Sequence, residues 1–174
     1  MPSPQSLSED DRRLVASWAA DCAERVLSLF EAEAPGDDRP RDAIARTRAF
    51  ARGDLTAAGE IKRRFVAGRA AGAVTSRSAV AAARAAAQAA GVAHMGAHAL
   101  GAAAYAARAA GAAETDASAA AARELQWQLE RMSDEVASAL RQLPRSVTTR
   151  PARSVLGCSP RATSVTISAR SRLG

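Results

Sequence analysis

Two histidines, His94 and His98, come closest in this sequence to a chemical site by residue type and spacing. A separation of four residues places both imidazoles on one face of a helix. Such a pair can hold a divalent metal ion or transfer a proton. A metal site needs a third ligand, which Asp37, Asp38 or Glu124 would supply only if the fold brought it near. We expect both histidines to hydrogen-bond across a tight helix interface, and we predict no metal site, no cofactor and no catalytic residue.

Tyr105 extends this pair into a polar line. It follows His98 by seven residues, so on a helix it lies near the same face two turns further along. We treat His94, His98 and Tyr105 as a candidate binding pocket. The enzymatic alternative is a metal-binding or hydrolytic helical bundle that uses His94 and His98.

A charged turn at residues 37–41 is the second candidate binding surface, with Asp37, Asp38, Arg39 and Arg41 around Pro40. It would serve as a charged recognition edge or as an anion site at a helix N-terminus. The structural interpretation needs no ligand: Asp38 caps the helix, Pro40 takes its first position, and an arginine pairs back to an acid. We favour the structural interpretation.

The cysteines and tryptophans point to structure rather than to chemistry. Cys22 and Cys158 are far apart, which indicates neither a disulfide framework nor a zinc ligand set. Cys22 follows Trp18 on an apolar stripe, so we expect a buried and inert thiol. Trp18 and Trp127 are expected to fill the core.

Composition sets the fold class that must position these residues. Alanine supplies 47 of the 174 residues, and there are only three Phe, two Trp and one Tyr. Alanine is the best helix former and a poor strand former, which favours an all-α protein and excludes collagen-like, disulfide-scaffold and β-sandwich folds. We predict a bundle of five to six helices over residues 7–143.

The first three helices have recognisable ends. Ser8 predicts the start of a helix that ends near Ala34, before Pro35 and Gly36. A second helix runs from the turn at residues 37–41 to Gly53. A third begins with Thr56 as N-cap and continues through the glycines at 68 and 72.

The rest of the bundle follows from one long segment and two shorter ones. Ser76 or Ser78 starts a helix that reaches about Ala110, with a possible bend or interruption at Gly91. Its many small residues allow a close approach of two backbones, either within one chain or between two copies in a homodimer. A fifth helix is predicted from Ala117 to Met132, and a sixth from an N-cap at Ser133 to Leu143.

Charge is distributed unevenly along the chain. Residues 1–143 contain 18 Arg or Lys and 18 Asp or Glu, whereas residues 144–174 contain six Arg and no acid. Nucleic-acid binding is therefore not expected of the body. We predict that residues 144–174 form a disordered Ser/Thr/Arg-rich tail, which either touches nucleic acid or an anionic surface or, as we favour, has no function. No signal peptide or membrane span is expected, and a cytoplasmic location is the default.

Four segments, taken in order, resemble one known family. They are LSEDDRRLVASWAADCAERVLSLFEAEAPGDDRPRDAI, RTRAFARGDLTAAG, AAGVAHMGAHALGAAAYAARAA and ELQWQLERM. Together they resemble the helical putative immunity proteins of bacteria, which belong to polymorphic-toxin systems. The resemblance covers residues 7–143 and is most specific at Trp18, Pro40, the run AHMGAHALGAAAYAA and Trp127.

The resemblance implies a small cytoplasmic all-α protein that binds a cognate protein toxin and neutralises it by occlusion. It carries no catalytic or toxin-contact residue over to this chain, because none is established for the family. The tail at residues 144–174 lies outside it.

Overall fold

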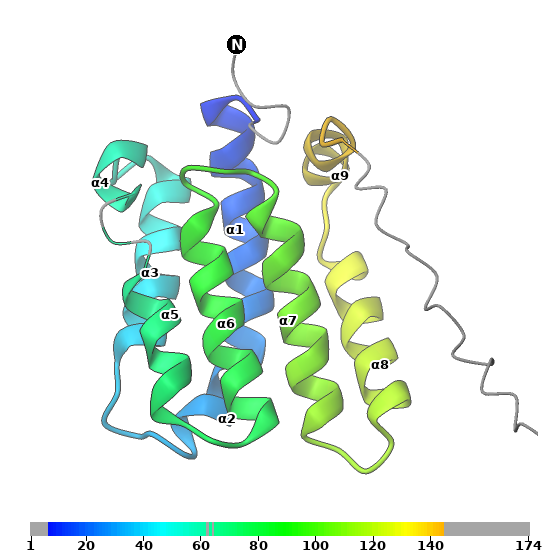
Figure 1. Cartoon of the computed structure of the whole chain (residues 1–174). Coiled ribbons are helices and arrows are strands. Elements are labelled where there is room, and N and C mark those ends of the chain that lie inside the picture. Colours follow the sequence, from blue (N-terminus) through cyan, green and yellow to red (C-terminus); the bar gives the residue numbers. More distant parts are fainter. Residues whose placement is uncertain (1–6, 62, 64, 145–174) are drawn as a thin grey trace, which may run out of the picture. The chain divides into compact units, whose positions relative to one another are not determined.

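The computed structural model describes residues 7–61, 63 and 65–144, and this part of the chain contains helices and no strand (Figure 1). The all-α prediction is confirmed, but the described part has nine α-helices rather than five or six. They are α1 (Glu9–Arg25), α2 (Leu27–Glu31), α3 (Arg39–Arg52), α4 (Ala57–Ile61), α5 (Val66–Ala70), α6 (Arg77–Gly91), α7 (His98–Ala112), α8 (Ala117–Glu130) and α9 (Asp134–Arg141), with a short 3-10 helix at Ala71–Ala73.

Helices α1 and α6 lie inside the bundle, and α6 also packs against α2, α3, α5 and α7. Helix α1 packs against α3, α6, α7 and α9, and α8 covers the far side of α7 (Figure 1). Its N-terminus is capped as predicted, because the Ser8 side chain accepts the backbone N–H of Asp11 at 3.0 Å. Val15 and Trp18 are buried on its inner face. None of the helices in the described part is both long and apolar enough to span a bilayer.

The first predicted helix is two helices. The chain leaves helical geometry at Val26, where φ is −109° and ψ is 3°, and α2 begins one residue later. This break redirects the chain so that Leu27 and Phe30 are buried and α2 packs against α6. The second predicted helix is α3, which ends as expected at Gly53, where φ is +90°.

The third predicted helix is also divided, into α4, α5 and the 3-10 turn that follows. Glycines at positions 59, 68 and 72 weaken a continuous helix in this stretch. The chain instead folds back, so that Glu60 becomes a buried partner of Arg46 on α3. Tertiary contacts here outweigh local helix propensity.

The long Ala-rich segment is a helical hairpin: the interruption that we allowed for at Gly91 is present, and a continuous helix to Ala110 is wrong. Helix α6 ends at Gly91, and α7 begins at His98 and packs closely along α6. A Cβ at Gly91 would lie 2.8 Å from Cδ2 of His98, and a Cβ at Gly101 would lie 2.3 Å from Oε1 of Gln88. Close backbone approach is therefore confirmed between the two halves of this segment, whereas the homodimer stays a prediction.

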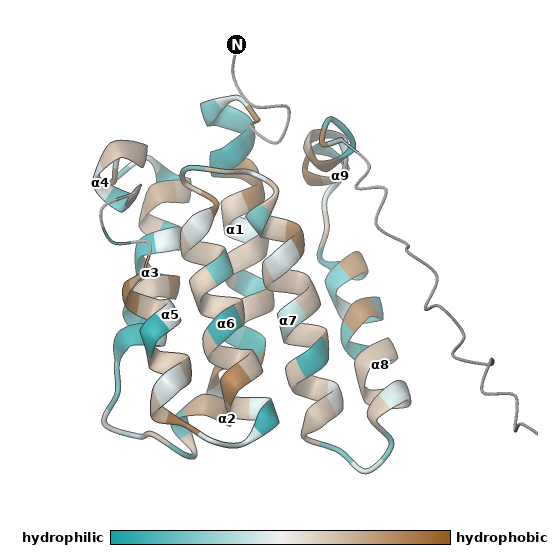
Figure 2. Ribbon diagram, in the orientation of Figure 1, coloured by the Kyte–Doolittle hydropathy of each residue, from teal (hydrophilic) through white to brown (hydrophobic). Residues whose placement is uncertain are grey.

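The last two helices agree with the sequence analysis. Asp116 caps α8 by accepting the N–H of Ala119 at 3.0 Å, and Ser133 caps α9 by accepting the N–H of Val136 at 3.3 Å. Figure 2 shows that α6 and α7 are mostly pale brown, the colour of weakly hydrophobic residues, with teal at the polar positions. The predicted tail lies, apart from Pro144, outside the described residues.

Candidate functional site

The two histidines come together, but they do not lie on one helix. His94 lies in the turn between α6 and α7, and His98 is the first residue of α7. Their ring centroids are 5.0 Å apart and their planes are inclined by 56°. The His98 Nδ1 atom lies 2.7 Å from Oε1 of Gln88 on α6, which is the hydrogen bond across a tight helix interface that we expected. Burial lowers the pKa of His98, so we assign a neutral ring that donates from Nδ1.

Two of the three potential third ligands are engaged elsewhere. Glu124 binds Arg25 and Gln128, and Asp37 binds Arg39. Within the residues that the structure describes, no three His, Cys, Asp or Glu side chains are grouped so that they could hold a metal ion.

Tyr105 lies on the seam between α6 and α7, as the predicted polar line requires. Its ring is approached by Arg84 of α6, whose guanidinium carbon lies 5.9 Å from the ring centroid. His98 contacts Gln88, one turn further along α6 from Arg84. The polar line therefore continues from the histidines down the seam to this arginine.

A groove opens at the other end of the seam, between α6, α7 and the first turns of α8. Its volume is about 540 Å³, and the histidines do not line it. The lining residues are three arginines, one valine and a floor of small residues: Arg77, Arg84, Arg108, Val80, Ala81, Ala107, Gly111, Ala112, Ala117 and Ala121. Tyr105 does not line this groove either, and the sequence analysis did not single out its three arginines.

Helix α8 presents leucines outward beside this groove. Leu125 is 47% exposed and Leu129 is 62% exposed, and Leu100 on α7 is 48% exposed. On α8 these leucines follow Ala121 at four-residue intervals, so they continue the face that lines the groove. On α7, Leu100 precedes Arg108 by eight residues and lies on the same side.

The inner face of α8 is polar, which reverses the usual amphipathic arrangement. Glu124 is 4% exposed and its Oε2 accepts from Arg25 Nε at 2.7 Å. Gln128 donates to Oε1 of Glu124 at 3.0 Å and to the carbonyl of Ala103 at 3.1 Å. Trp18 donates from its indole N–H to the carbonyl of Gln128 at 2.9 Å. These bonds hold α8 in a rotation that leaves its leucines on the surface.

The interpretation of the aromatic and sulfur residues is confirmed in part. Trp18 is buried, but Trp127 is only half-buried and lies against Arg25 and Arg131, at 4.4 Å and 5.7 Å from its ring. Burial, with a smaller contribution from the charge of Glu124, raises the pKa of Cys22 to about 12. A thiol in this state is unreactive, as expected. Cys158 lies outside the described residues.

The turn at residues 37–41 forms pairs within the fold. The Asp37 carboxylate pairs with the Arg39 guanidinium and accepts the Arg39 backbone N–H at 3.2 Å, and the side-chain bond to Arg39 lowers the pKa of Asp37. Arg41 pairs with Glu31 at 2.5 Å. Asp38 makes no side-chain cap, so the capping prediction is wrong and Asp37 binds the backbone in its place. Three of these four charged residues therefore have structural partners.

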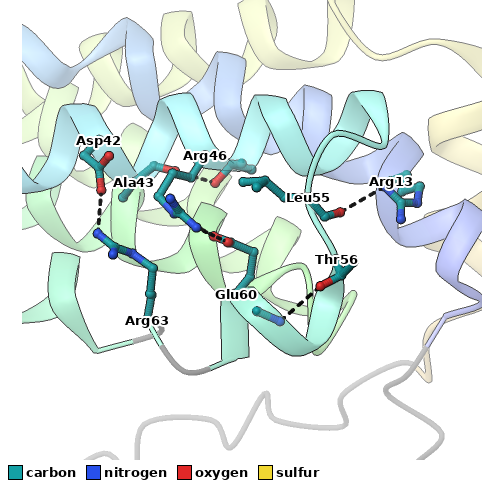
Figure 3. A network of polar contacts seen from close by, with 10 residues as sticks. Arg13, Asp42, Ala43, Arg46, Leu55, Thr56, Glu60 and Arg63 are labelled. Atoms are coloured by element: carbon teal, nitrogen blue, oxygen red, sulfur yellow. Dashed lines mark hydrogen bonds and ion pairs between the residues drawn. The ribbon is translucent and has the colours of Figure 1, made fainter.

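A further polar network, which the sequence analysis missed, holds α4 against α3 (Figure 3). Arg46 reaches the buried Glu60, and Arg63 pairs with Asp42 at 3.1 Å. Thr56 accepts the N–H of Gly59 at 3.3 Å. Because these groups satisfy one another, the network anchors α4 against α3.

The fold and the site together define a small all-α bundle that carries an open groove and exposed leucines on its α6, α7 and α8 side. The family model described as Imm-5 like putative immunity protein matches residues 5–135, and the chain belongs to this family. No curated protein and no solved structure matched the chain.

Proposed function

We propose that the protein binds a cognate toxin and neutralises it by covering the toxin's active surface. The binding surface would be the α6–α8 face, which we define by Arg77, Arg84 and Arg108 together with Leu100, Leu125 and Leu129. The observation that carries the proposal is the exposure of Leu125 and Leu129 on a helix that turns Glu124 and Gln128 inward, in a chain of an immunity family.

The energetics favour a partner on this face. Transferring a leucine side chain from water to an apolar contact is worth about 1.5–3 kcal/mol. The three leucines lie on α7 and α8, which are already formed, so little conformational entropy is lost when they are covered. Exposed apolar residues grouped beside polar ones are typical of protein interaction sites.

The balanced charge of the body bears on the kind of toxin that it would bind. Basic and acidic residues balance over residues 1–143, so the body has no strong field of one sign. A strongly basic nuclease would be better matched by an acidic inhibitor. We therefore expect a toxin whose contact surface is not strongly basic.

Occlusion is preferred to the two alternatives raised by the sequence. Metal-dependent chemistry at His94 and His98 has no third ligand in the described part of the chain. Nucleic-acid binding through residues 144–174 concerns residues that, apart from Pro144, the structure does not describe. Neither alternative is favoured by a specific observation.

The test is a capture experiment followed by a growth assay. The full chain is used as bait beside the double variant Leu125→Glu/Leu129→Glu and the control Leu14→Glu, which changes an exposed leucine of α1 away from the α6–α8 face. We expect the wild type and the control to capture the same protein and the double variant to lose it. Expression of the captured protein should stop growth, and co-expression of the wild type should restore it. A captured protein that is harmless, or whose toxicity the wild type does not relieve, would contradict the proposal.

A further inference from the structure

The groove gathers three arginines whose charges no carboxylate of the described residues compensates, whereas the other four described arginines without such a partner, Arg12, Arg69, Arg131 and Arg141, do not line it. Nine other arginines of the described part form ion pairs with carboxylates. Arg77, Arg84 and Arg108 all line one groove, and none of them has a carboxylate partner among the described residues.

The nearest carboxylates in the sequence around the groove have other tasks. Glu33 accepts the backbone N–H groups of Thr75 and Ser76 just before α6, at 2.5 Å and 3.2 Å. Glu114 pairs with Arg123 at 2.9 Å, and Asp116 caps α8. The groove therefore keeps its positive charge while the body as a whole is balanced.

The arginines are arranged along a helix axis. Arg77 and Arg84 are seven residues apart on α6, which corresponds to two turns and a rise of about 10.5 Å. Arg84 packs over the ring of Tyr105, which restricts its side chain. Arg108 lies across the groove on α7. Between them the floor is Val80 and small residues, on which an apolar surface can pack closely.

From this geometry we infer that the groove binds an acidic α-helical segment of the toxin, with two carboxylates seven residues apart that meet Arg77 and Arg84. This inference rests on the proposed function and names the chemistry of the partner. A helix fits the spacing of the arginines, because its carboxylates at positions i and i+7 are separated along the helix axis by the same ~10.5 Å as Arg77 and Arg84. Its small or apolar side chains between the carboxylates would cover the floor.

A nucleic acid fits the same arginines less well. Its phosphates would leave the valine and alanine floor uncovered. Bases bind proteins without sequence preference largely by stacking on aromatic rings, and Tyr105 is already covered by Arg84. The charge balance of residues 1–143 also gives no general attraction to a polyanion.

A synthetic helix tests the inference without the toxin. The probe is an alanine-rich helical peptide with two glutamates seven residues apart, and its control has glutamine at both positions. Each is titrated into the full chain while the arginine Nε–Hε resonances are followed by NMR. We expect the glutamate peptide to shift the resonances of Arg77 and Arg84 in a saturable way, and the glutamine peptide to bind at least about fivefold more weakly.

Variants of the chain assign the contact. Arg77→Glu and Arg84→Glu should each weaken binding of the glutamate peptide at least about tenfold, because reversal replaces attraction by repulsion. The matched control is Arg141→Glu on α9, an exposed arginine that also has no carboxylate partner among the described residues and does not line the groove. It should change affinity less than about twofold. Circular dichroism confirms that each variant keeps its helices.

Several results would overturn the inference. They are equal binding of the two peptides, no binding of the glutamate peptide, equal loss in Arg141→Glu, or displacement of the peptide by inorganic phosphate or single-stranded DNA at lower concentration than the peptide itself needs. Neutralisation of the captured toxin by Arg77→Glu/Arg84→Glu at wild-type level would also overturn it while leaving the proposed function intact. If co-expression of the wild type does not restore growth, the proposed function is contradicted, irrespective of the peptide-binding results.

Discussion

Glu124 and Gln128 show how single residues decide which surface the bundle presents. Both are buried on α8, where the Glu124 carboxylate accepts from Arg25 and the Gln128 amide donates to the carbonyl of Ala103. Buried polar groups need such partners, and here the partners exist only in one rotation of the helix. That rotation places Leu125 and Leu129 outside. The exposed leucines are thus a consequence of satisfied polar groups.

Glu33 provides a residue-scale test through pH. Hydrogen bonds from Ser76, and next from the N–H of Thr75, lower the pKa of Glu33 from 4.5 to about 2. Because the folded pKa lies below the unfolded one, the stabilisation by Glu33 is present above pH 4.5 and is lost as the pH falls toward 2. We expect Glu33→Gln to lower the melting temperature at pH 7 and the difference from wild type to shrink across this window.

The control for this test is Glu130→Gln, an exposed glutamate at the end of α8 whose carboxylate accepts from Gln126. It should melt close to wild type at pH 7. Thermal melts of all three proteins from pH 7 down to the lowest pH at which they fold give the comparison. A Glu33→Gln deficit that stays constant down to that pH would show that the carboxylate charge does not stabilise the start of α6.

At the scale of elements, helix contact through small residues carries the bundle. The hairpin of α6 and α7 is buried largely through alanines, and a Cβ at Gly91 or Gly101 would press on the side chains of His98 and Gln88. The stability of such interfaces is lowered mainly by added side-chain volume, because alanine and glycine have little side-chain volume to lose.

Gly111 tests this packing. A Cβ at Gly111 would lie 2.8 Å from the carbonyl oxygen of Ala117, a backbone atom that cannot move without shifting α8. Gly111→Ala should therefore lower the free energy of unfolding by about 1–3 kcal/mol. The same change at Gly72, where nothing lies within 4 Å, should be neutral or slightly stabilising. Denaturant unfolding measures both, and equal stability of the two variants would show that α7 and α8 are not in close contact at this point.

The sequence predicts helix ends better than helix connections. Ser8, Gly53 and Ser133 act where expected, because capping is a local interaction of side chain and backbone. The end of α6 at Gly91 was one of two alternatives in the sequence, since Gly91 and Gly96 fit both a tight interface inside a helix and a turn, and no proline separates them from the alanines around them. Only the packing of α7 against α6 decides between these possibilities.

The candidate site was predictable to a similar extent. The proximity of His94, His98 and Tyr105 to one seam follows from their spacing, even though the helix assignment of His94 was wrong. The sequence did not predict the groove, because Arg108 of α7 lines the same groove as Arg77 and Arg84 only once α6 and α7 have folded into a hairpin. The seven-residue spacing of Arg77 and Arg84 in the sequence indicates that both lie on the same face of a helix, which makes that face basic.

For the whole molecule, α8 is the element whose behaviour should change most on binding. It lies at the edge of the bundle next to α7, and its buried residues are Ala120, Glu124 and Gln128 (Figure 1). With so little apolar area buried, α8 should open more readily than α6 or α7. A partner that covers Leu125 and Leu129 would stabilise it.

Hydrogen exchange of the full chain, measured by mass spectrometry with and without the captured toxin, tests the central claim most directly. In the free protein we predict faster exchange in α8 than in α6 and α7. With toxin bound, we predict strong slowing in α8 and the exposed turns of α7, and no change in α3 and α4. Protection confined to α3 and α4, or a complex in which α8 exchanges as fast as in the free chain, would contradict the assignment of the α6–α8 face as the toxin-binding surface.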